Sequence, residues 1–193
     1  MPSAQRHPDR RHAKRTVRGF SLTELLVTIG VFAILAALSG PSMARFYYSA
    51  RANQLSGALM ATLRQGRNEA MKRNIGVLVC PSNTAATNCA SATDWASNGW
   101  LVCYSATSTT TCDAGSAALP NPIMIQGPQS TSFATIVGPA TAIRFNSYGA
   151  QASSTNVVLT ITGTWSKAVP LTITVYPNGQ AIGTRMTSMS THS

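Results

Sequence analysis

The order of apolar and polar residues divides the chain into three stretches of different periodicity. The first stretch, Leu22–Leu38, is almost wholly apolar over 17 residues, with Glu24 as its single charge. As a helix it would span roughly 25 Å, near the lower limit for crossing a membrane. Gly40 and Pro41 follow, and we expect them to break this helix because proline lacks an N–H and clashes with the preceding turn.

The second stretch has apolar residues at helical spacing. Positions three and four apart form one stripe: Tyr48, Ala52, Leu55, Leu59, Thr62, Leu63, Gly66 and Ala70. Most basic residues fall off the stripe, which indicates a solvated face, with contact to acidic neighbours or lipid headgroups as the alternative. Glu69 can pair with Arg73 at i,i+4. From Ser21 to about Asn74 the sequence therefore predicts one long helix, interrupted at Gly40 and Pro41, whose second half needs an apolar surface.

The third stretch supplies that surface. Short runs rich in Val, Ile, Thr and aromatic residues are separated by Gly, Pro, Asn and Ser, as is typical of strands. The expected strands are 76–80, 100–104, 122–126, 131–137, 141–145, 156–162, 171–176 and 180–184. Partial alternation in the two runs 157–162 and 171–175 is typical of half-buried antiparallel strands, and Pro177-Asn178-Gly179 is a turn. The predicted fold class is α+β: a long N-terminal helix packed on an antiparallel β-sheet head.

The charge is unevenly distributed. The net charge of +10 would suit a nucleic-acid-binding protein. However, residues 1–19 and 45–74 each carry six cations and one carboxylate, whereas residues 75–193 carry three cations and two carboxylates. The β-rich region is therefore nearly neutral, which weakens the nucleic-acid interpretation.

Four cysteines lie in the β-rich region. An even number behind a membrane-targeting segment favours two disulfides in an oxidising compartment. A zinc site fits less well, because there is no Cys-x-x-Cys and the histidines (His7, His12 and His192) lie near the termini. We expect the pairs Cys80–Cys89 and Cys103–Cys112, which close short loops, with Cys80–Cys103 as an open alternative.

The residues do not support catalysis. No histidine lies between His12 and His192, so a Ser-His-Asp or Cys-His arrangement cannot form within that region. Asp94 and Asp113 lie in the cysteine-bearing loops, where they can cap turns. Trp95, Trp100 and Trp165 suit core or hairpin packing better than a binding platform. We expect no enzymatic activity, no cofactor and no metal.

The basic segment 1–19 before the apolar run predicts topology. The positive-inside rule places it in the cytoplasm and the region after Leu38 outside. An ordinary signal peptide, cleaved within 39–44 to give an N-terminus near Arg45, is an alternative.

One stretch carries a family resemblance. Gly19-Phe20-Ser21-Leu22-Thr23-Glu24-Leu25-Leu26, followed by Pro41, resembles the type III signal of type IV pilins and pseudopilins. The resemblance implies that a prepilin peptidase cleaves after Gly19 and methylates Phe20. It also implies that Glu24 faces the new amine of Phe20 on a neighbouring subunit. Such a partner makes physical sense, since a carboxylate and an ammonium taken out of water each need one.

The head resembles the GspH/FimT group of minor pilins and pseudopilins. The similar segments are 64–70, 76–82, 95–102, 143–149 and 173–179. Some DNA-binding members end in a Gly-Arg-x-Arg tail, but here Gln180 occupies the first basic position and Arg185 is the only nearby cation. One arginine is a poor basis for phosphate binding, which needs several cations. We therefore expect Arg185 to provide at most a weak DNA contact.

Together these features predict a minor pilin or pseudopilin of a type IV pilus or type II secretion pseudopilus. It would prime assembly or occupy the tip, with a DNA-binding minor pilin for DNA uptake as the alternative. The predicted parts are a removed leader (1–19), a transmembrane half-helix (20–44), an amphipathic periplasmic half (45–74), a periplasmic head (75–185) and a flexible tail (186–193). We expect a single-pass protein of the bacterial inner membrane. Its expected partners are the prepilin peptidase, other pilins and the assembly platform.

Overall fold

A computed structural model describes residues 20–185, with the backbone alone described for residues 38–42. The predictions for Gly19, the leader and the tail lie outside the described residues. The chain divides into two compact units, the first ending at Pro41 and the second beginning at Ser42. Each unit is considered by itself.

One helix, α1, covers Leu22–Arg73. The backbone stays helical through Gly40 and Pro41, so a local loss of helix there is wrong, and a kink at this point stays a prediction. Pro41 removes a single N–H donor, and the remaining ladder bonds keep the helix together. Among the described residues, no helical segment combines the length and the hydrophobicity that crossing a membrane requires. Membrane insertion of residues 20–44 stays a prediction.

The end of α1 agrees with the sequence. Asn74 adopts the left-handed conformation with φ of 55°. The N–H of Ile75 then donates to the carbonyl oxygen of Ala70 at 3.3 Å. This is a C-terminal cap built on asparagine, one of the few non-glycine residues that tolerate this conformation.

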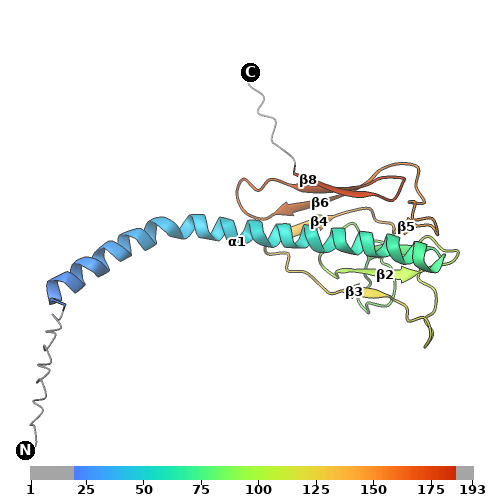
Figure 1. Cartoon of the computed structure of the whole chain (residues 1–193), viewed down its shortest axis with the longest axis horizontal. Helices are drawn as coiled ribbons and strands as arrows, with labels where there is room; N and C mark the ends of the chain where they lie inside the picture. The colour runs from blue at the N-terminus through green and yellow to red at the C-terminus, as the bar shows by residue number, and fades with distance from the viewer. Residues whose placement is uncertain (1–19, 186–193) are drawn as a thin grey trace, which may run out of the picture. The chain divides into compact units, whose positions relative to one another are not determined.

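The head contains eight short strands in two four-stranded antiparallel sheets, where we expected one sheet (Figure 1). The first sheet has the order β3-β2-β1-β5, with β1 Val77–Pro81, β2 Trp100–Tyr104, β3 Met124–Gln126 and β5 Ile143–Phe145. The second has the order β4-β6-β7-β8, with β4 Ala134–Val137, β6 Val157–Gly163, β7 Leu171–Val175 and β8 Ala181–Arg185. The α+β class is confirmed.

A single core joins the second half of α1 to both sheets. Figure 1 shows this part of α1 alongside β2 on one side and β4, β6 and β8 on the other. The predicted stripe faces this core, since Ala52, Leu59, Leu63 and Ala70 are buried. Strands β6 and β7 place Leu159 opposite Ile173 in the core, while Val158 on the other face of β6 is exposed. The stripe is therefore broad enough to serve two sheets.

Strands β1 and β2 are buried on both faces. Val79 and Val102 face the helix, whereas Leu78, Cys80, Leu101 and Cys103 form a second apolar cluster on the opposite face. Cys89 and Cys112 pack against this cluster from the two long loops. The loops thus cover a face that would otherwise be solvated, which explains why these strands read as continuous apolar runs.

Candidate functional site

The first described turn of α1 sets the position of Glu24. The Oγ of Ser21 accepts the backbone N–H of Glu24 at 3.2 Å, and the carbonyl oxygen of Ser21 accepts the N–H of Leu25 at 3.1 Å. Ser21 is therefore the N-cap, and Ser21-x-x-Glu24 has the spacing of a capping box. A carboxylate in the first helical turn is also favoured by the helix dipole.

Exposed apolar side chains surround Glu24 along the first unit. Residues at least half exposed are Phe20, Leu22, Leu25, Leu26, Val27, Ile29, Val31, Phe32, Ile34 and Leu35. Glu24 is itself exposed, and it is the only charged residue from Phe20 to Ala44. This surface can be buried only against lipid or other apolar helices, and its one carboxylate then needs a cationic partner.

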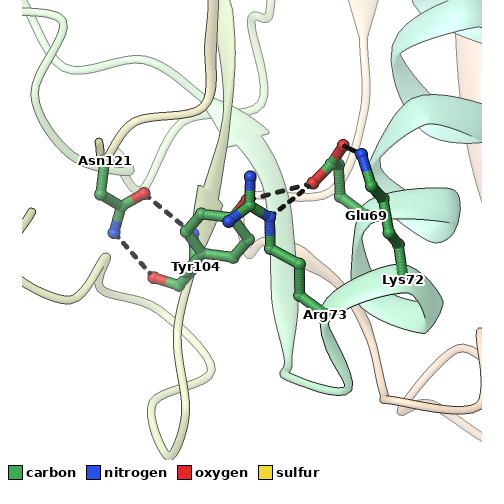
Figure 2. Close-up of polar contacts among 5 residues, drawn as sticks. All are labelled: Glu69, Lys72, Arg73, Tyr104 and Asn121. Carbon is green, nitrogen blue, oxygen red and sulfur yellow. Dashed lines mark hydrogen bonds and ion pairs between the residues drawn. The ribbon is translucent and has the colours of Figure 1, made fainter. Parts of the chain in front are cut away.

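A polar cluster fastens the end of α1 to β2 (Figure 2). The Nε of Arg73 donates to Glu69 Oε2 at 3.0 Å, which confirms the predicted pair, and Lys72 lies 4.0 Å from Oε1. The hydroxyl of Tyr104 donates to the same Oε2 at 3.1 Å, and the Arg73 guanidinium lies over the tyrosine ring. The Asn121 side chain pairs with the Tyr104 backbone, accepting its N–H at 2.9 Å and donating to its carbonyl oxygen at 3.0 Å.

This cluster shifts two ionisation equilibria. Burial on its own would raise the pKa of Glu69, but the hydrogen bonds from Arg73 and Tyr104 and the charge of Lys72 bring it below its ordinary value. Burial raises the pKa of Tyr104, and its hydrogen bond to the Glu69 carboxylate raises it further. Both shifts favour the pair as drawn, a carboxylate facing a neutral phenol. The cluster therefore stabilises the head and offers no proton for transfer near neutral pH.

A second contact brings together three segments of the GspH/FimT resemblance. Arg67 on α1 donates from Nε to the carbonyl oxygen of Gly149 at 3.0 Å. Gly149 and Gly179 both have positive φ, 76° and 78°, and a Cβ on Gly179 would collide with the carbonyl oxygen of Gly149. The two turns thus meet beside one arginine. In the sequence, Arg67, Gly149 and Gly179 belong to three separate motifs, and nothing there shows that they are in contact.

Close packing fixes the helix on the first sheet. The indole N–H of Trp100 donates to Thr62 Oγ1 at 3.1 Å in the core. A Cβ on Gly66 would lie 2.7 Å from Val79 Cγ2, so helix and strand approach closely only because residue 66 is glycine. Trp95 is also buried and donates to the carbonyl oxygen of Pro139 at 3.1 Å. The core role predicted for Trp95 and Trp100 is confirmed.

Both predicted disulfides are present, Cys80–Cys89 and Cys103–Cys112, and the alternative Cys80–Cys103 is wrong. The side-chain oxygen of Asn88 accepts the backbone N–H of Cys89 at 2.8 Å and that of Cys112 at 2.9 Å. One asparagine therefore links the two disulfide loops over the outer face of the first sheet.

The acidic residues of the loops hold backbone. Asp94 accepts the N–H of Ala96 at 2.8 Å and bonds to the Ser97 hydroxyl; that hydroxyl bond is the main cause that lowers the pKa of Asp94. Asp113 accepts the N–H of Ala106 at 2.8 Å.

Arg185, at the end of β8, donates to the side chain of Asn53 on α1 at 2.9 Å. A separate hollow of about 270 Å³, lined by Arg64, Arg67, Asn68 and residues 179–181, adjoins the hairpin turn.

Two features define the class of type IV pilin-like subunits. One is an apolar helical segment with a single carboxylate in its first turn, and the other is an amphipathic helical stripe that packs on antiparallel sheets. Comparison with protein families supports this class and narrows it. The family described as type II transport protein GspH matches residues 56–179, and the prokaryotic N-terminal methylation motif matches residues 14–40. The chain belongs to the GspH family.

Solved structures show the same fold. The type IV minor pilin FimU of Pseudomonas aeruginosa strain PAO1, in space group P21, is 13% identical with a TM-score of 0.50, covering 74% of this chain and 91% of FimU. A second FimU crystal form, P65, is 12% identical with a TM-score of 0.50, covering 68% and 91%. No curated protein sequence matches.

Proposed function

We propose that this chain is a minor subunit of a type IV pilus or a type II secretion pseudopilus. Prepilin peptidase removes residues 1–19, methylates Phe20 and leaves residues 20–44 in the inner membrane with the head in the periplasm. The subunit then enters the filament at low copy, priming assembly or occupying its tip beside other pilins. The observation that carries the proposal is Glu24, one exposed carboxylate among exposed apolar side chains in the segment that matches the methylation motif.

The same observation gives Glu24 its role. When the apolar segment is buried, an unpaired carboxylate costs several kcal/mol, roughly 2.5–3.5 at the centre of a membrane helix. The amine freed at Phe20 of a neighbouring subunit supplies the missing charge. Because both groups are near the same end of the segment, their pairing sets the axial register between subunits.

Two measurements test the proposal. Mass spectrometry of the mature protein should find an N-terminus at Phe20 carrying one added methyl group, and Gly19→Ala should leave the full-length chain uncleaved. Glu24→Gln should be processed normally yet fail to enter filaments, while Thr28→Val, a change on the same helix, should assemble. An N-terminus near Arg45 would instead indicate an ordinary signal peptide and overturn the proposal.

DNA uptake is the alternative function. The exposed Arg64 and the half-buried Arg67 line a hollow beside Gln180. Arg185 lies apart from them, because it is bonded to Asn53, which precedes Arg64 by eleven residues on α1. Cations that lie apart release few counterions together, so DNA binding would be weak and its affinity would change little with salt. Gel retardation of duplex DNA by the detergent-solubilised chain at low and high salt distinguishes the two functions.

A further inference from the structure

The end of the head from which α1 emerges carries aromatic and basic side chains together. We call this surface the basal collar and define it by Arg45, Tyr47, Tyr48, Arg51, Phe133, Trp165, Lys167 and Arg185. Tyr48 packs against two rings, with centroid distances of 5.6 Å to Phe133 and 6.3 Å to Trp165, and the indole is stacked at 17°. Tyr47 packs on Phe133 at 5.9 Å and remains 47% exposed.

Within the described part of the chain, the collar's cations form no ion pair with a carboxylate. Among residues 20–185 the ion pairs described are those of Glu69 with Lys72 and Arg73, near the C-terminal end of α1. Arg51 lies over the Tyr47 ring, 5.4 Å from its centroid, and Arg185 bonds to the neutral Asn53. These contacts hold the cations at this end without neutralising them, so the collar presents uncompensated positive charge beside aromatic rings.

Lys167 is placed in an unusual backbone conformation. It lies in the turn between β6 and β7 with φ of 62°, where glycine would be unstrained. The N–H of Ala168 donates to the carbonyl oxygen of Trp165 at 3.2 Å and closes this turn. Trp165, Lys167 and Arg185 line one hollow of about 170 Å³ beside Ser49 and Asn53 of α1. Lys167 therefore adopts a left-handed backbone conformation that is unfavourable for lysine.

We propose that the basal collar docks on the anionic phospholipid headgroups of the membrane that holds residues 20–44, before the subunit enters a filament. This inference rests on the proposed membrane insertion. Tyr48 follows Ala44 by four residues, about 6 Å along a helix, and the headgroup layer is about 5–8 Å thick on each side. Aromatic rings favour this interface, and each nearby cation contributes about a fivefold change in attraction to anionic lipid.

The collar contains its own reporter. Trp95 and Trp100 are fully buried in the core, so Trp165, which is half-buried in the collar, is the tryptophan that lipid can approach. The full processed chain is reconstituted in phosphatidylcholine vesicles with rising fractions of phosphatidylglycerol, both brominated near the headgroup. We expect fluorescence quenching to rise with the anionic fraction and to fall at high salt. Trp165→Phe should remove the quenching.

Charge variants localise the effect. Lys167→Gly suits the turn and Arg185→Gln can keep the bond to Asn53; each should weaken docking about fivefold. Arg64→Gln removes an exposed cation from the hollow beside Gln180 and should leave docking unchanged. Quenching independent of anionic lipid, or an equal effect of Arg64→Gln, would overturn the inference.

Membrane insertion and lipid docking are distinguished by separate measurements. If the chain does not float with vesicles after alkaline extraction, membrane insertion itself is wrong. If it floats but shows no charge-dependent quenching, the docking inference alone is wrong. Collar variants that quench normally yet fail to assemble would overturn lipid docking and assign the surface to an acidic protein partner.

Discussion

Arg67 and Gly149 lie 82 positions apart in the chain, and the guanidinium of one donates to the carbonyl oxygen of the other at 3.0 Å. The contact ties the C-terminal part of α1 to the turn that follows β5. Gly179, in the turn before β8, packs against the same carbonyl group. One arginine therefore supports two turns, one after β5 at the edge of the first sheet and one between β7 and β8 of the second. The segments that carry the family resemblance here are structural, since they join helix to sheets.

The first prediction concerns this contact. Arg67→Ala should lower the free energy of unfolding by about 1.5–3 kcal/mol, because it removes a charge-assisted hydrogen bond and leaves a partly buried carbonyl group unpaired. Arg67→Lys should recover only part of the loss, since a lysine lacks the planar guanidinium. Urea unfolding followed by circular dichroism measures both. Arg64→Ala, an exposed arginine one turn earlier, serves as the control and should be nearly neutral.

The second prediction concerns the two glycines. Gly179→Ala should destabilise the head by more than 1 kcal/mol, because alanine disfavours a positive φ and its Cβ would collide with the Gly149 carbonyl oxygen. The matched control is Gly127→Ala, where a Cβ would meet nothing within 4 Å. Thermal melts of the two variants give the comparison. Equal melting temperatures for the two variants would show that the turns do not depend on this packing.

The sequence was most informative where a signal is local or periodic. The helix stripe, the Glu69–Arg73 pair, the end of the helix near Asn74 and the two short disulfide loops all follow from spacing within about ten residues, and all are confirmed. The exception is Pro41. Its lost N–H is a local cost, and the neighbouring helical hydrogen bonds offset it, so the backbone continues as a helix.

What the sequence could not supply is the choice of partners across long separations. Alternation shows that Val158 and Leu159 face opposite sides of a strand, but not which strand lies beside it, so the division into two sheets was missed. The Tyr104–Glu69 bond and the Arg67–Gly149 bond were missed for the same reason. Each joins residues that come together only after α1 has packed on the sheets.

The third prediction concerns the disulfides. Replacing either pair by alanine should cost about 2–3 kcal/mol, because each closes a loop with a sequence separation of 9 and frees it on removal. It should also uncover Leu78 and Leu101, and so increase binding of a hydrophobic dye. The two losses should not be additive, since Asn88 bonds to both loops. A double-mutant cycle, repeated with Asn88→Ala, would contradict this coupling if the losses simply summed.

The fourth prediction is a pH dependence that comes from Glu69. Its pKa is below the ordinary value of 4.5 in the folded chain, so folding favours the carboxylate. The stability it contributes is therefore present above the pKa of the unfolded chain and is lost as the pH falls through the folded pKa. Glu69→Gln should be less stable than the unmodified chain at neutral pH, and the gap should narrow progressively below about pH 5. Because Asp94 also has a lowered pKa and is present in both proteins, the difference between their curves isolates Glu69.

Tyr104→Phe provides the matched control, because it removes one hydrogen bond to Glu69 and keeps the ion pairs with Arg73 and Lys72. The free energy of unfolding of Tyr104→Phe should still fall at acid pH, but by less than that of the unmodified chain. At alkaline pH the stability of the unmodified chain should fall relative to that of Tyr104→Phe. Tyr104 has a raised pKa, so its contribution is complete below its unfolded pKa and is lost as the pH rises through the folded value. Urea unfolding from acid to alkaline pH measures all three proteins. Parallel curves for the unmodified chain and Glu69→Gln would show that the cluster in Figure 2 does not hold a carboxylate at the end of α1.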